Sequence, residues 1–346
     1  MRIIVSIAAL TSLLALATFG AAGAQASTGA DLRVVASSGE LDDLTQYSDT
    51  TNMPSSQQAD CFFGSTGSGR TVTAPGANAL GIVVEAAESR SDLNPLLLTD
   101  AYVDQGLGMG VCGIGGQVAH GNAFWETKVD HKLLQVGGST FPLHPGDQVL
   151  WYLVPDYTAP PAKELVLNAP VREPTGTPFP VQVLAYDDNG AATPAVGATV
   201  SGGSAPVTTD ASGNAVITPA GTGLGALQAS RSGDIPSEAM QICAAQNVSS
   251  CPVARGRLIV GSDGDDDITG TSGNDQIKPR AGSDKVRAMA GDDRIDVRGG
   301  GKDRVNCGGG ADSVKADKRD KLAKNCEQRS RAGKKHKHGK KGKGKK

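Results

Sequence analysis

A short segment that recurs six times near the C-terminal end constrains the fold of this chain more than any other sequence feature. Each copy holds a glycine, an aspartate two residues later, and an isoleucine or valine two residues after the aspartate. The aspartates follow one another at intervals of 9, 9, 9, 10 and 9 residues, at Asp266, Asp275, Asp284, Asp293, Asp303 and Asp312. Because so short a unit cannot bury an apolar side by itself, we expect successive units to stack around one core.

The nine-residue unit has a direct structural interpretation. Glycine tolerates positive φ and favours a turn, while the aspartate and the apolar residue belong to a short strand whose apolar side chain points into the core. Two units complete one coil, which places Asp266 and Asp284 in one row and Asp275 and Asp293 in another. Stacked carboxylates repel one another. A hard cation such as calcium, which takes roughly six to eight oxygen ligands, removes that repulsion.

The pattern resembles the nonapeptide repeats of RTX (haemolysin-type) calcium-binding proteins. The resemblance implies a parallel β-roll over residues 257–328 that takes calcium as its cofactor and folds when calcium binds. The calcium ligands that it implies are Asp263, Asp266, Asp275, Asp284, Asp293, Asp303 and Asp312. The array is degenerate, because 279–281 and 288–290 replace the glycine-rich turns of the third and fourth units. A roll of the same shape that binds little or no calcium is the alternative.

The first residues carry the features of an export signal. Arg2 precedes a largely apolar stretch that ends in a small-x-small cleavage site, Ala24-Gln25-Ala26. This order predicts a secretory signal peptide over residues 1–26, cut between Ala26 and Ser27. An uncleaved membrane anchor is the alternative. No second run of about 18 apolar residues follows, so we expect a secreted, extracellular chain.

The six cysteines are compatible with an oxidising compartment. They fall into three pairs, one in each of three segments: Cys61 with Cys112, Cys243 with Cys251, and Cys307 with Cys326. Three disulfides within these segments are the simplest interpretation, although other connectivities are formally possible. A zinc site is the alternative, but the sequence offers no C-x-x-C motif or nearby histidine for it.

Residues 27–157 form the first predicted domain, a compact α/β unit with a β-grasp-like sheet wrapped on one helix. Thr73 can cap the helix, and apolar residues then recur at three- and four-residue steps, which gives one apolar face. These residues are Leu80, Val83, Val84 and Ala87. Strands are predicted at 32–35, 96–98, 101–103, 124–131 and 148–154, with a glycine-rich loop at 106–116.

Two runs in this segment resemble a bacterial domain of unknown function that is related to the C-terminal domain of transcobalamin and intrinsic factor. They are Phe124-Trp125-Glu126-Thr127-Lys128-Val129-Asp130-His131 and Leu143-His144-Pro145-Gly146-Asp147-Gln148-Val149-Leu150-Trp151-Tyr152. In the vertebrate relatives this domain forms part of a corrinoid site, so the resemblance permits a small-ligand role. This chain lacks the α-barrel that completes that site. Trp125, Trp151 and Tyr152 are alternatively core or cross-strand residues.

Residues 160–254 are predicted to form an Ig-like β-sandwich that acts as a spacer. Short alternating strands are expected at 181–186, 198–200, 215–217 and 226–229, separated by turn clusters. The fragments 194–200 and 209–215 resemble bacterial Ig-like surface modules. The resemblance implies a role in spacing or adhesion.

The C-terminal residues 329–346 hold ten Lys or Arg and no Asp or Glu, although the formal net charge of the whole chain is −2. Such a Lys- and Gly-rich tail is predicted to be disordered. It could contact an anionic cell-wall polymer or a membrane surface, and a solvated tail that only aids solubility is the alternative. Because no aromatic residues interleave with these charges, we expect no sequence-specific nucleic-acid recognition.

The sequence therefore predicts a multidomain, mainly β chain. It contains no G-x-S-x-G, H-E-x-x-H or P-loop motif, and its cysteines are better used as disulfides than as nucleophiles. We expect a secreted, non-enzymatic binding or surface-associated protein whose C-terminal repeats bind calcium. An extracellular receptor for a small, corrinoid-like ligand and a secreted enzyme of unknown class are the alternatives.

Overall fold

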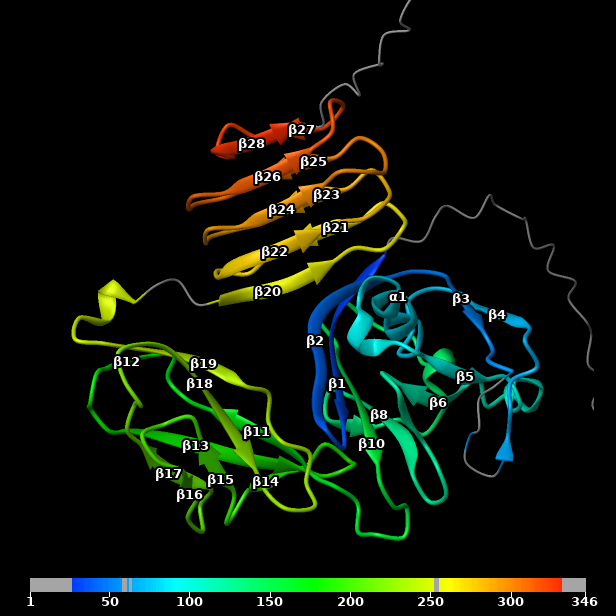
Figure 1. The fold of residues 1–346 in the computed structure, drawn as a ribbon, viewed down its shortest axis with the longest axis horizontal. Coiled ribbons are helices and arrows are strands. Elements are labelled where there is room, and N and C mark those ends of the chain that lie inside the picture. Colours follow the sequence, from blue (N-terminus) through cyan, green and yellow to red (C-terminus); the bar gives the residue numbers. More distant parts are fainter. Residues whose placement is uncertain (1–26, 58–60, 62–63, 252–254, 332–346) are drawn as a thin grey trace, which may run out of the picture.

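The computed structural model describes residues 27–57, 61, 64–251 and 255–331. The prediction of a mainly β chain is confirmed (Figure 1). We distinguish an N-terminal region (28–154), a middle region (164–245) and a repeat region (255–331). Figure 1 shows the repeat region stacked above the N-terminal region, with the middle region beside it. The predicted signal peptide, residues 1–26, lies outside the described residues.

The N-terminal region is built on one sheet with the strand order β2, β1, β10, β8, β9. The bounds of these strands are Gly39–Ser48, Thr28–Ala36, Gln148–Val154, Phe124–Val129 and Lys132–Leu133. β1 and β10 are parallel, and the other neighbours are antiparallel. Two small sheets complete the region, β3 (Thr51–Pro54) with β4 (Thr71–Ala74), and β5 (Leu97–Thr99), β6 (Gly110–Ile114) and β7 (Gln117–Val118). Its 3-10 helices are Ser91–Leu93, Val103–Gln105 and Gly138–Thr140.

The helix α1 (Gly81–Ser89) lies against β2 and β3, and its first seven residues are buried. The predicted cap at Thr73 is wrong, because Thr73 belongs to β4 and pairs with Asn52 of β3. The Asn78 side chain instead accepts a hydrogen bond from the Gly81 amide at 2.8 Å. This bond satisfies one of the backbone N–H groups that the first turn of a helix leaves free.

The glycine-rich loop predicted at 106–116 is wrong for its second half, which forms the buried strand β6. β6 lies between β5 and β7, and a Cβ on Gly113 would lie 3.2 Å from the carbonyl oxygen of Gln117. Glycine therefore serves close strand packing here instead of a turn. The strand predicted at 101–103 is also absent, because a turn leads into the 3-10 helix Val103–Gln105.

Both tryptophans of the chain lie in the core of the N-terminal region. Trp125 is 7% exposed and Trp151 is 4% exposed. Their indole N–H groups donate to backbone carbonyls, of Gln117 at 3.1 Å and of Ala79 at 2.7 Å. Because both indoles are buried with their polar atom satisfied, they serve as core residues.

The middle region consists of two sheets that enclose one apolar core. In the first sheet, β13 (Phe179–Tyr186) pairs with β11 (Glu164–Asn168), β14 (Ala192–Pro194) and β17 (Asn214–Ile217). The second sheet has the order β12 (Arg172–Pro174), β19 (Met240–Ala245), β18 (Gly223–Ser230), β15 (Thr199–Ser201) and β16 (Val207–Thr208). A 3-10 helix, Val248–Ser250, follows β19. The four strands predicted here correspond to β13, β15, β17 and β18.

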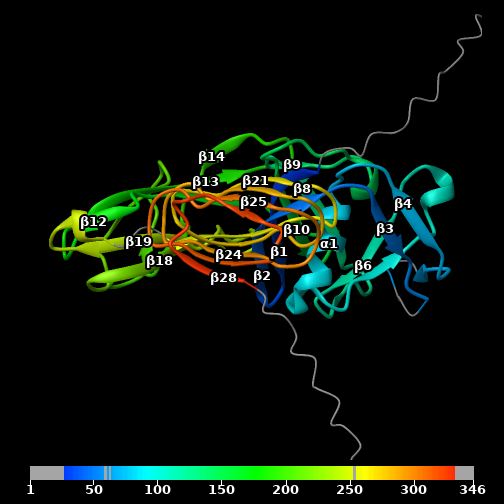
Figure 2. The same cartoon turned by 90° about the horizontal axis from the view of Figure 1, so that it is seen from above.

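The strands of the repeat region alternate between two parallel sheets, which Figure 2 shows from above. One sheet contains β20 (Arg255–Val260), β22 (Asn274–Lys278), β24 (Arg294–Val297), β26 (Ser313–Ala316) and β28 (Gln328–Arg331). The other contains β21 (Asp267–Thr269), β23 (Lys285–Arg287), β25 (Arg304–Asn306) and β27 (Lys321–Leu322). The apolar residue of each unit points between the sheets and is at most 3% exposed, at Ile268, Ile277, Val286, Ile295, Val305 and Val314.

The repeat region shares a sheet with the N-terminal region. β20 pairs in parallel with β2, with Thr45 opposite Ile259 and Gln46 opposite Val260, so the two regions form one ten-stranded sheet. Tyr47 of β2 packs against the core of the repeats. The N-terminal region therefore provides the layer on which the first coil stacks, a connection that the sequence did not predict.

The structure contains the disulfides Cys61–Cys112, Cys243–Cys251 and Cys307–Cys326, which are the pairs expected from the sequence. Cys307 and Cys326 are 0% and 1% exposed and belong to the core of the repeats. This disulfide closes a loop of one coil at the C-terminal end of the repeat region.

Replacing both Cys307 and Cys326 with alanine is expected to lower the free energy of unfolding of the repeat region by about 3 kcal/mol. The crosslinked residues are 19 apart, and opening the link restores the chain entropy of that loop to the unfolded state. Urea denaturation followed by far-ultraviolet circular dichroism measures the change. An unchanged unfolding midpoint would contradict the stabilising role of the link.

The predicted disorder of the tail is wrong for its first three residues. Residues 329–331 belong to β28, which pairs in parallel with β26. The Arg329 guanidinium donates to the carbonyl oxygens of Ala323 and Lys324 at 2.8 and 2.9 Å and also to that of Cys326. These bonds hold the start of the basic segment on the last coil. The rest of the predicted tail, 332–346, lies outside the described residues.

Within the part of the chain that the structure describes, no helix has the length and apolar character needed to cross a membrane.

Candidate functional site

The six repeat aspartates form two rows in the interior of the turns, one on each side of the repeat region. Each of these side chains is at most 3% exposed. Asp266, Asp284 and Asp303 belong to the first row, and Asp275, Asp293 and Asp312 to the second. A row therefore stacks buried carboxylates from consecutive coils, which requires each one to find a partner or lose its charge.

Within each row the carboxylate of one coil accepts a hydrogen bond from the backbone N–H of the aspartate in the preceding coil. In the first row the Asp266 amide donates to Asp284 Oδ1 at 3.0 Å, and the Asp284 amide to Asp303 Oδ1 at 2.8 Å. In the second row the Asp275 amide donates to Asp293 Oδ1 at 2.8 Å, and the Asp293 amide donates to Asp312 Oδ1 at 3.0 Å. One oxygen of each of these four carboxylates therefore links its coil to the preceding one.

The first two units satisfy the second carboxylate oxygen with their own turn. Ser262, four residues before Asp266, donates from its amide to Oδ2 at 2.8 Å and from its hydroxyl to Oδ1 at 2.9 Å. Thr271 makes the same two bonds to Asp275, at 2.6 and 2.8 Å. Both carboxylate oxygens of these two aspartates therefore accept hydrogen bonds from the protein.

The later units lack this hydroxyl, and three of their aspartates keep an oxygen without a hydrogen-bond partner. The position four residues before the aspartate holds Arg280, Met289 and Gly308 in the third, fourth and sixth units, and each has a positive φ. No side-chain hydroxyl can donate from these residues. The Oδ2 atoms of Asp284, Asp293 and Asp312 are buried and have no hydrogen-bond partner. These are the oxygens that a bound cation would need.

The electrostatic environment of the rows disfavours the ionised form of the aspartates. Burial, together with the neighbouring charges of Asp266 and Asp303, raises the pKa of Asp284 to about 7. Burial likewise raises the pKa of Asp293 to about 7, together with its neighbours in the second row. Both rows therefore favour binding of a proton or of a metal cation.

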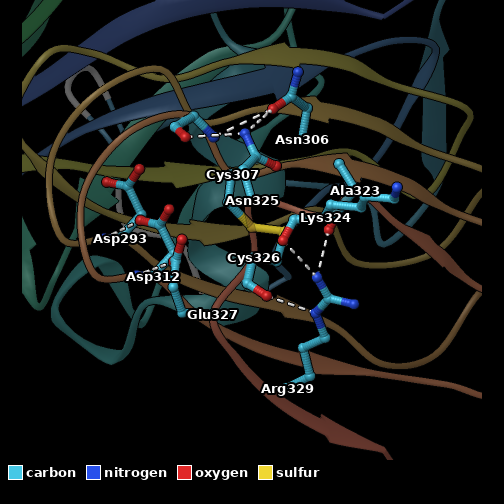
Figure 3. Close-up of a disulfide and its surroundings, with 11 residues drawn as sticks. Asp293, Asn306, Cys307, Asp312, Ala323, Lys324, Asn325, Cys326, Glu327 and Arg329 are labelled. Carbon is cyan, nitrogen blue, oxygen red and sulfur yellow. Dashed lines mark hydrogen bonds between the residues drawn. A yellow bond between two sulfur atoms is a disulfide. The ribbon is translucent and has the colours of Figure 1, made fainter.

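Each row has a further acidic member that was not among the predicted ligands. The Asp303 amide donates to Asp320 Oδ1 at 3.3 Å, and the Asp312 amide donates to Glu327 Oε2 at 3.0 Å. Asp320 lies two residues before Leu322, as the aspartate does before the apolar residue of each unit, but Glu327 follows Cys326 outside the nine-residue pattern. The C-terminal disulfide lies beside the second row and holds Glu327 at its end (Figure 3).

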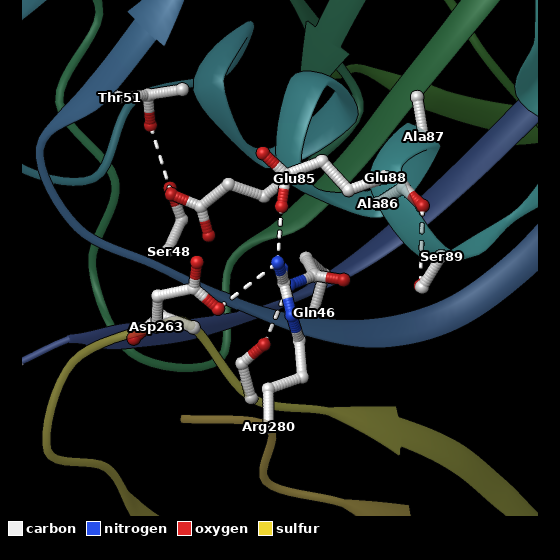
Figure 4. Close-up of polar contacts among 12 residues, drawn as sticks. Gln46, Ser48, Thr51, Glu85, Ala86, Ala87, Glu88, Ser89, Asp263 and Arg280 are labelled. Carbon is white, nitrogen blue, oxygen red and sulfur yellow. Dashed lines mark hydrogen bonds and ion pairs between the residues drawn. The ribbon is translucent and has the colours of Figure 1, made fainter. Parts of the chain in front are cut away.

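The structure places Asp263, another predicted ligand, outside both rows. Its side chain is 70% exposed and forms an ion pair with Arg280 at 3.0 Å. Arg280 also contacts Glu88 of helix α1 (Figure 4). Arg280 therefore joins the repeat region to the N-terminal region, and its partner Asp263 is not stacked with the repeat aspartates.

The aspartate rows offer the kind of oxygen ligands that calcium takes, provided that backbone carbonyl oxygens complete the ligand set. Among the described residues, no group of three or more His, Cys, Asp or Glu side chains is arranged to hold a metal. The turns nevertheless bring backbone carbonyls close to the carboxylates: a Cβ on Gly282 would overlap the Gly264 carbonyl and lie 2.9 Å from Asp284 Oδ1. Glycine at this position keeps carboxylate and carbonyl oxygens adjacent, and calcium accepts both kinds.

A separate cleft of about 880 Å³ lies where the three regions meet. Arg257 lies in it and contacts Asp43 at 2.6 Å, Asp31 at 3.5 Å and Glu238 at 3.7 Å. Burial raises the pKa of Glu238 to about 7, aided by a hydrogen bond with Asp43 and by its charge. The cleft is therefore polar, and one arginine is shared by three carboxylates.

No protein-family model matches this chain, and neither a curated protein nor a solved structure is similar to it. The functional interpretation therefore depends on the geometry of the aspartate rows.

Proposed function

We propose that the chain is a secreted, non-enzymatic binding or surface protein whose repeats form an RTX-type β-roll that binds calcium. The observation that carries this proposal is the set of buried, unpartnered Oδ2 atoms on Asp284, Asp293 and Asp312. An unpaired buried carboxylate is costly, and a divalent cation removes the cost for two carboxylates at once.

The residues of the middle coils would hold the ion. Asp284 with Asp303 in the first row, and Asp293 with Asp312 in the second, offer carboxylate oxygens from consecutive coils. Carbonyl oxygens of the glycine turns, such as that of Gly264, complete the oxygen-rich environment. Bound calcium supplies positive charge between coils. In the first two units Ser262 and Thr271 already donate to the aspartate oxygens, which leaves less need for a cation there. We therefore expect the repeat region to bind fewer calcium ions than it has units.

The test is a calcium titration of the whole chain from residue 27, since the repeat region shares a sheet with β2 and is not an independent unit. Isothermal titration calorimetry should show saturable heat. Thermal unfolding should shift upwards with calcium concentration, because a ligand that binds only the folded state stabilises it. The protein is first freed of metal with a chelator. If the added calcium then produces no heat and no shift of the unfolding temperature, calcium binding is refuted.

Asp293→Asn is expected to weaken calcium binding by about tenfold or more, because it removes a charged ligand oxygen from a middle coil. Asp263→Asn is the matched control, since it removes one negative charge from an exposed site outside the rows. Its affinity should stay within about twofold of the parent. Equal losses in the two variants would show that only overall charge matters, and would contradict the assignment of ligands to the rows.

Secretion and surface association belong to the same proposal. The predicted signal peptide supports export, and the three disulfides fit an oxidising compartment. The Ig-like interpretation of the middle region supports a spacer between the N-terminal region and a partner. The basic residues 332–346 would contact an anionic cell-wall polymer or membrane surface through salt-sensitive interactions.

A small-ligand function is the second candidate, and the cleft where the three regions meet favours it. Its volume of about 880 Å³ is that of a typical ligand site. Titration with cobalamin, followed by its visible absorbance, tests the corrinoid-like alternative directly. Saturable binding would support it, and unchanged spectra up to millimolar protein would exclude a corrinoid.

A further inference from the structure

Ser27 lies where the first aspartate row meets the N-terminal region. It precedes β1, and the register of β1 on β2 places Thr28 opposite Ser48, so Ser27 lies next to Asp49 across the strand pair. The Ser27 hydroxyl donates a hydrogen bond to Asp266 Oδ1. Figure 1 shows the start of β1, in deep blue, directly below the lowest coil of the repeats.

Negative charge gathers around this position. Asp266 is 3% exposed, and burial together with the charge of Asp49 raises its pKa. Burial and the charge of Asp263 raise the pKa of Asp49. The nearby cation, Arg280, already contacts Asp263 and Glu88. The start of the first row thus holds more carboxylate charge than its described basic neighbours balance.

The backbone nitrogen of Ser27 must lie near these carboxylates. Three covalent bonds separate this nitrogen from the hydroxyl oxygen, so covalent geometry keeps the two atoms within ~4 Å of each other. Because the hydroxyl contacts Asp266, the nitrogen lies within roughly 6 Å of its carboxylate, a range in which opposite charges interact strongly. In an uncleaved chain this nitrogen belongs to an uncharged peptide bond.

We infer that cleavage between Ala26 and Ser27 converts this nitrogen into an α-ammonium group that pairs with Asp266 and completes the first row. A signal peptidase hydrolyses the peptide bond: water supplies the oxygen of the new Ala26 carboxylate, and the Ser27 nitrogen leaves as the protonated amine. The inference rests on the predicted cleavage site. It makes removal of the signal peptide a step that stabilises the repeat region at the opposite end of the sequence.

The first test compares two forms of the chain made by cleaving an N-terminal fusion. One form starts at Ser27, and the other carries one additional glycine, which moves the ammonium group by one residue. Thermal unfolding is measured with a chelator, so the result does not depend on calcium binding. We expect the glycine-extended form to unfold about 2–4 °C lower. In an Asp266→Asn background the two forms should unfold at the same temperature.

Equal unfolding temperatures in the parent background would overturn the inference. So would an equal difference in both backgrounds, because that result would mean a general effect of the extra residue. Asp267→Asn serves as a control, since Asp267 is exposed and pairs with Lys285 and Arg287.

A second measurement does not depend on the folding of any variant. The α-amine of the form starting at Ser27 is treated with an amine-acylating reagent, in the folded state and in denaturant. An ammonium group held by Asp266 should react at least about fivefold more slowly in the folded protein. Equal rates would contradict the ion pair. N-terminal sequencing of the exported protein must also give Ser27 as the first residue, and any other start would refute the assignment.

Discussion

Lowering the pH from 8 to 5 in calcium-free buffer is expected to stabilise the repeat region through Asp284 and Asp293. Their pKa values are raised from the ordinary 3.8 to about 7 in the folded chain. The folded state therefore holds more protons than the unfolded state between these two values, and its stability falls as pH rises through this range. The gain on acidification is on the order of 2 kcal/mol for each aspartate.

The measurement is urea denaturation at pH 8, 7, 6 and 5 in the presence of a chelator that works at each pH. The Asp284→Asn/Asp293→Asn double variant is the control, because neutral amides replace the two carboxylates and remove their titration. The difference between parent and variant isolates these groups from the other carboxylates of the chain. Parallel pH profiles for parent and variant would contradict the prediction. In saturating calcium the sign should reverse, since protons then compete with the metal.

The second large effect is expected from Ile277→Ala. Ile277 is fully buried between the two sheets of the repeat region and lies opposite Ile259 and Ile295 in the neighbouring strands. Removing three carbon atoms leaves a cavity in a narrow core that has little room to rearrange. The free energy of unfolding of the repeat region should fall by about 2–5 kcal/mol.

Lys278→Ala is the matched control, since Lys278 is the next residue of β22 and is exposed. Its effect should stay within about 0.5 kcal/mol. Chemical denaturation of both variants in the same buffer gives the comparison. A loss below about 1 kcal/mol for Ile277→Ala would mean that the repeat core is loosely packed, which would argue against a single stacked core.

The sequence predicted the stacking of the repeats well because their period is local. A step of nine residues, with one of ten, determines that Asp266 and Asp284 belong to one row and Asp275 and Asp293 to the other. The same step places the isoleucine or valine of every unit in the core. Period and residue type together are sufficient for this part of the fold, since each unit contacts only its neighbours.

The partners of the aspartates were harder to predict. Ser262 and Thr271 stand four residues before their aspartates, so the hydroxyl pattern was readable, but it becomes meaningful only once the turn geometry is known. Glu327 enters the second row because the chain ends its coiling there, and no nine-residue pattern marks it. Asp263 fits the sequence pattern but faces Arg280 outside the rows.

The pairing of β2 with β20 could not be predicted from the sequence. The two strands are more than 200 residues apart, and nothing in either strand specifies its partner. Pairing between distant strands depends on side-chain packing across the interface, such as that of Tyr47, which propensity does not encode. The prediction of Thr73 as the helix cap was wrong for a related reason, because Thr73 belongs to β4 and pairs with β3.

Among the described residues the ten-stranded sheet ends in two outer strands, β9 and β28, and β28 carries the start of the basic segment. Among the described strands β28 pairs with β26 alone, and an outer strand of this kind is where a strand of a second molecule would add. Arg329 and Arg331 are exposed on this strand. Two such strands brought together would place like charges side by side, so we expect Arg329 and Arg331 to disfavour edge-to-edge growth of the sheet into fibrils.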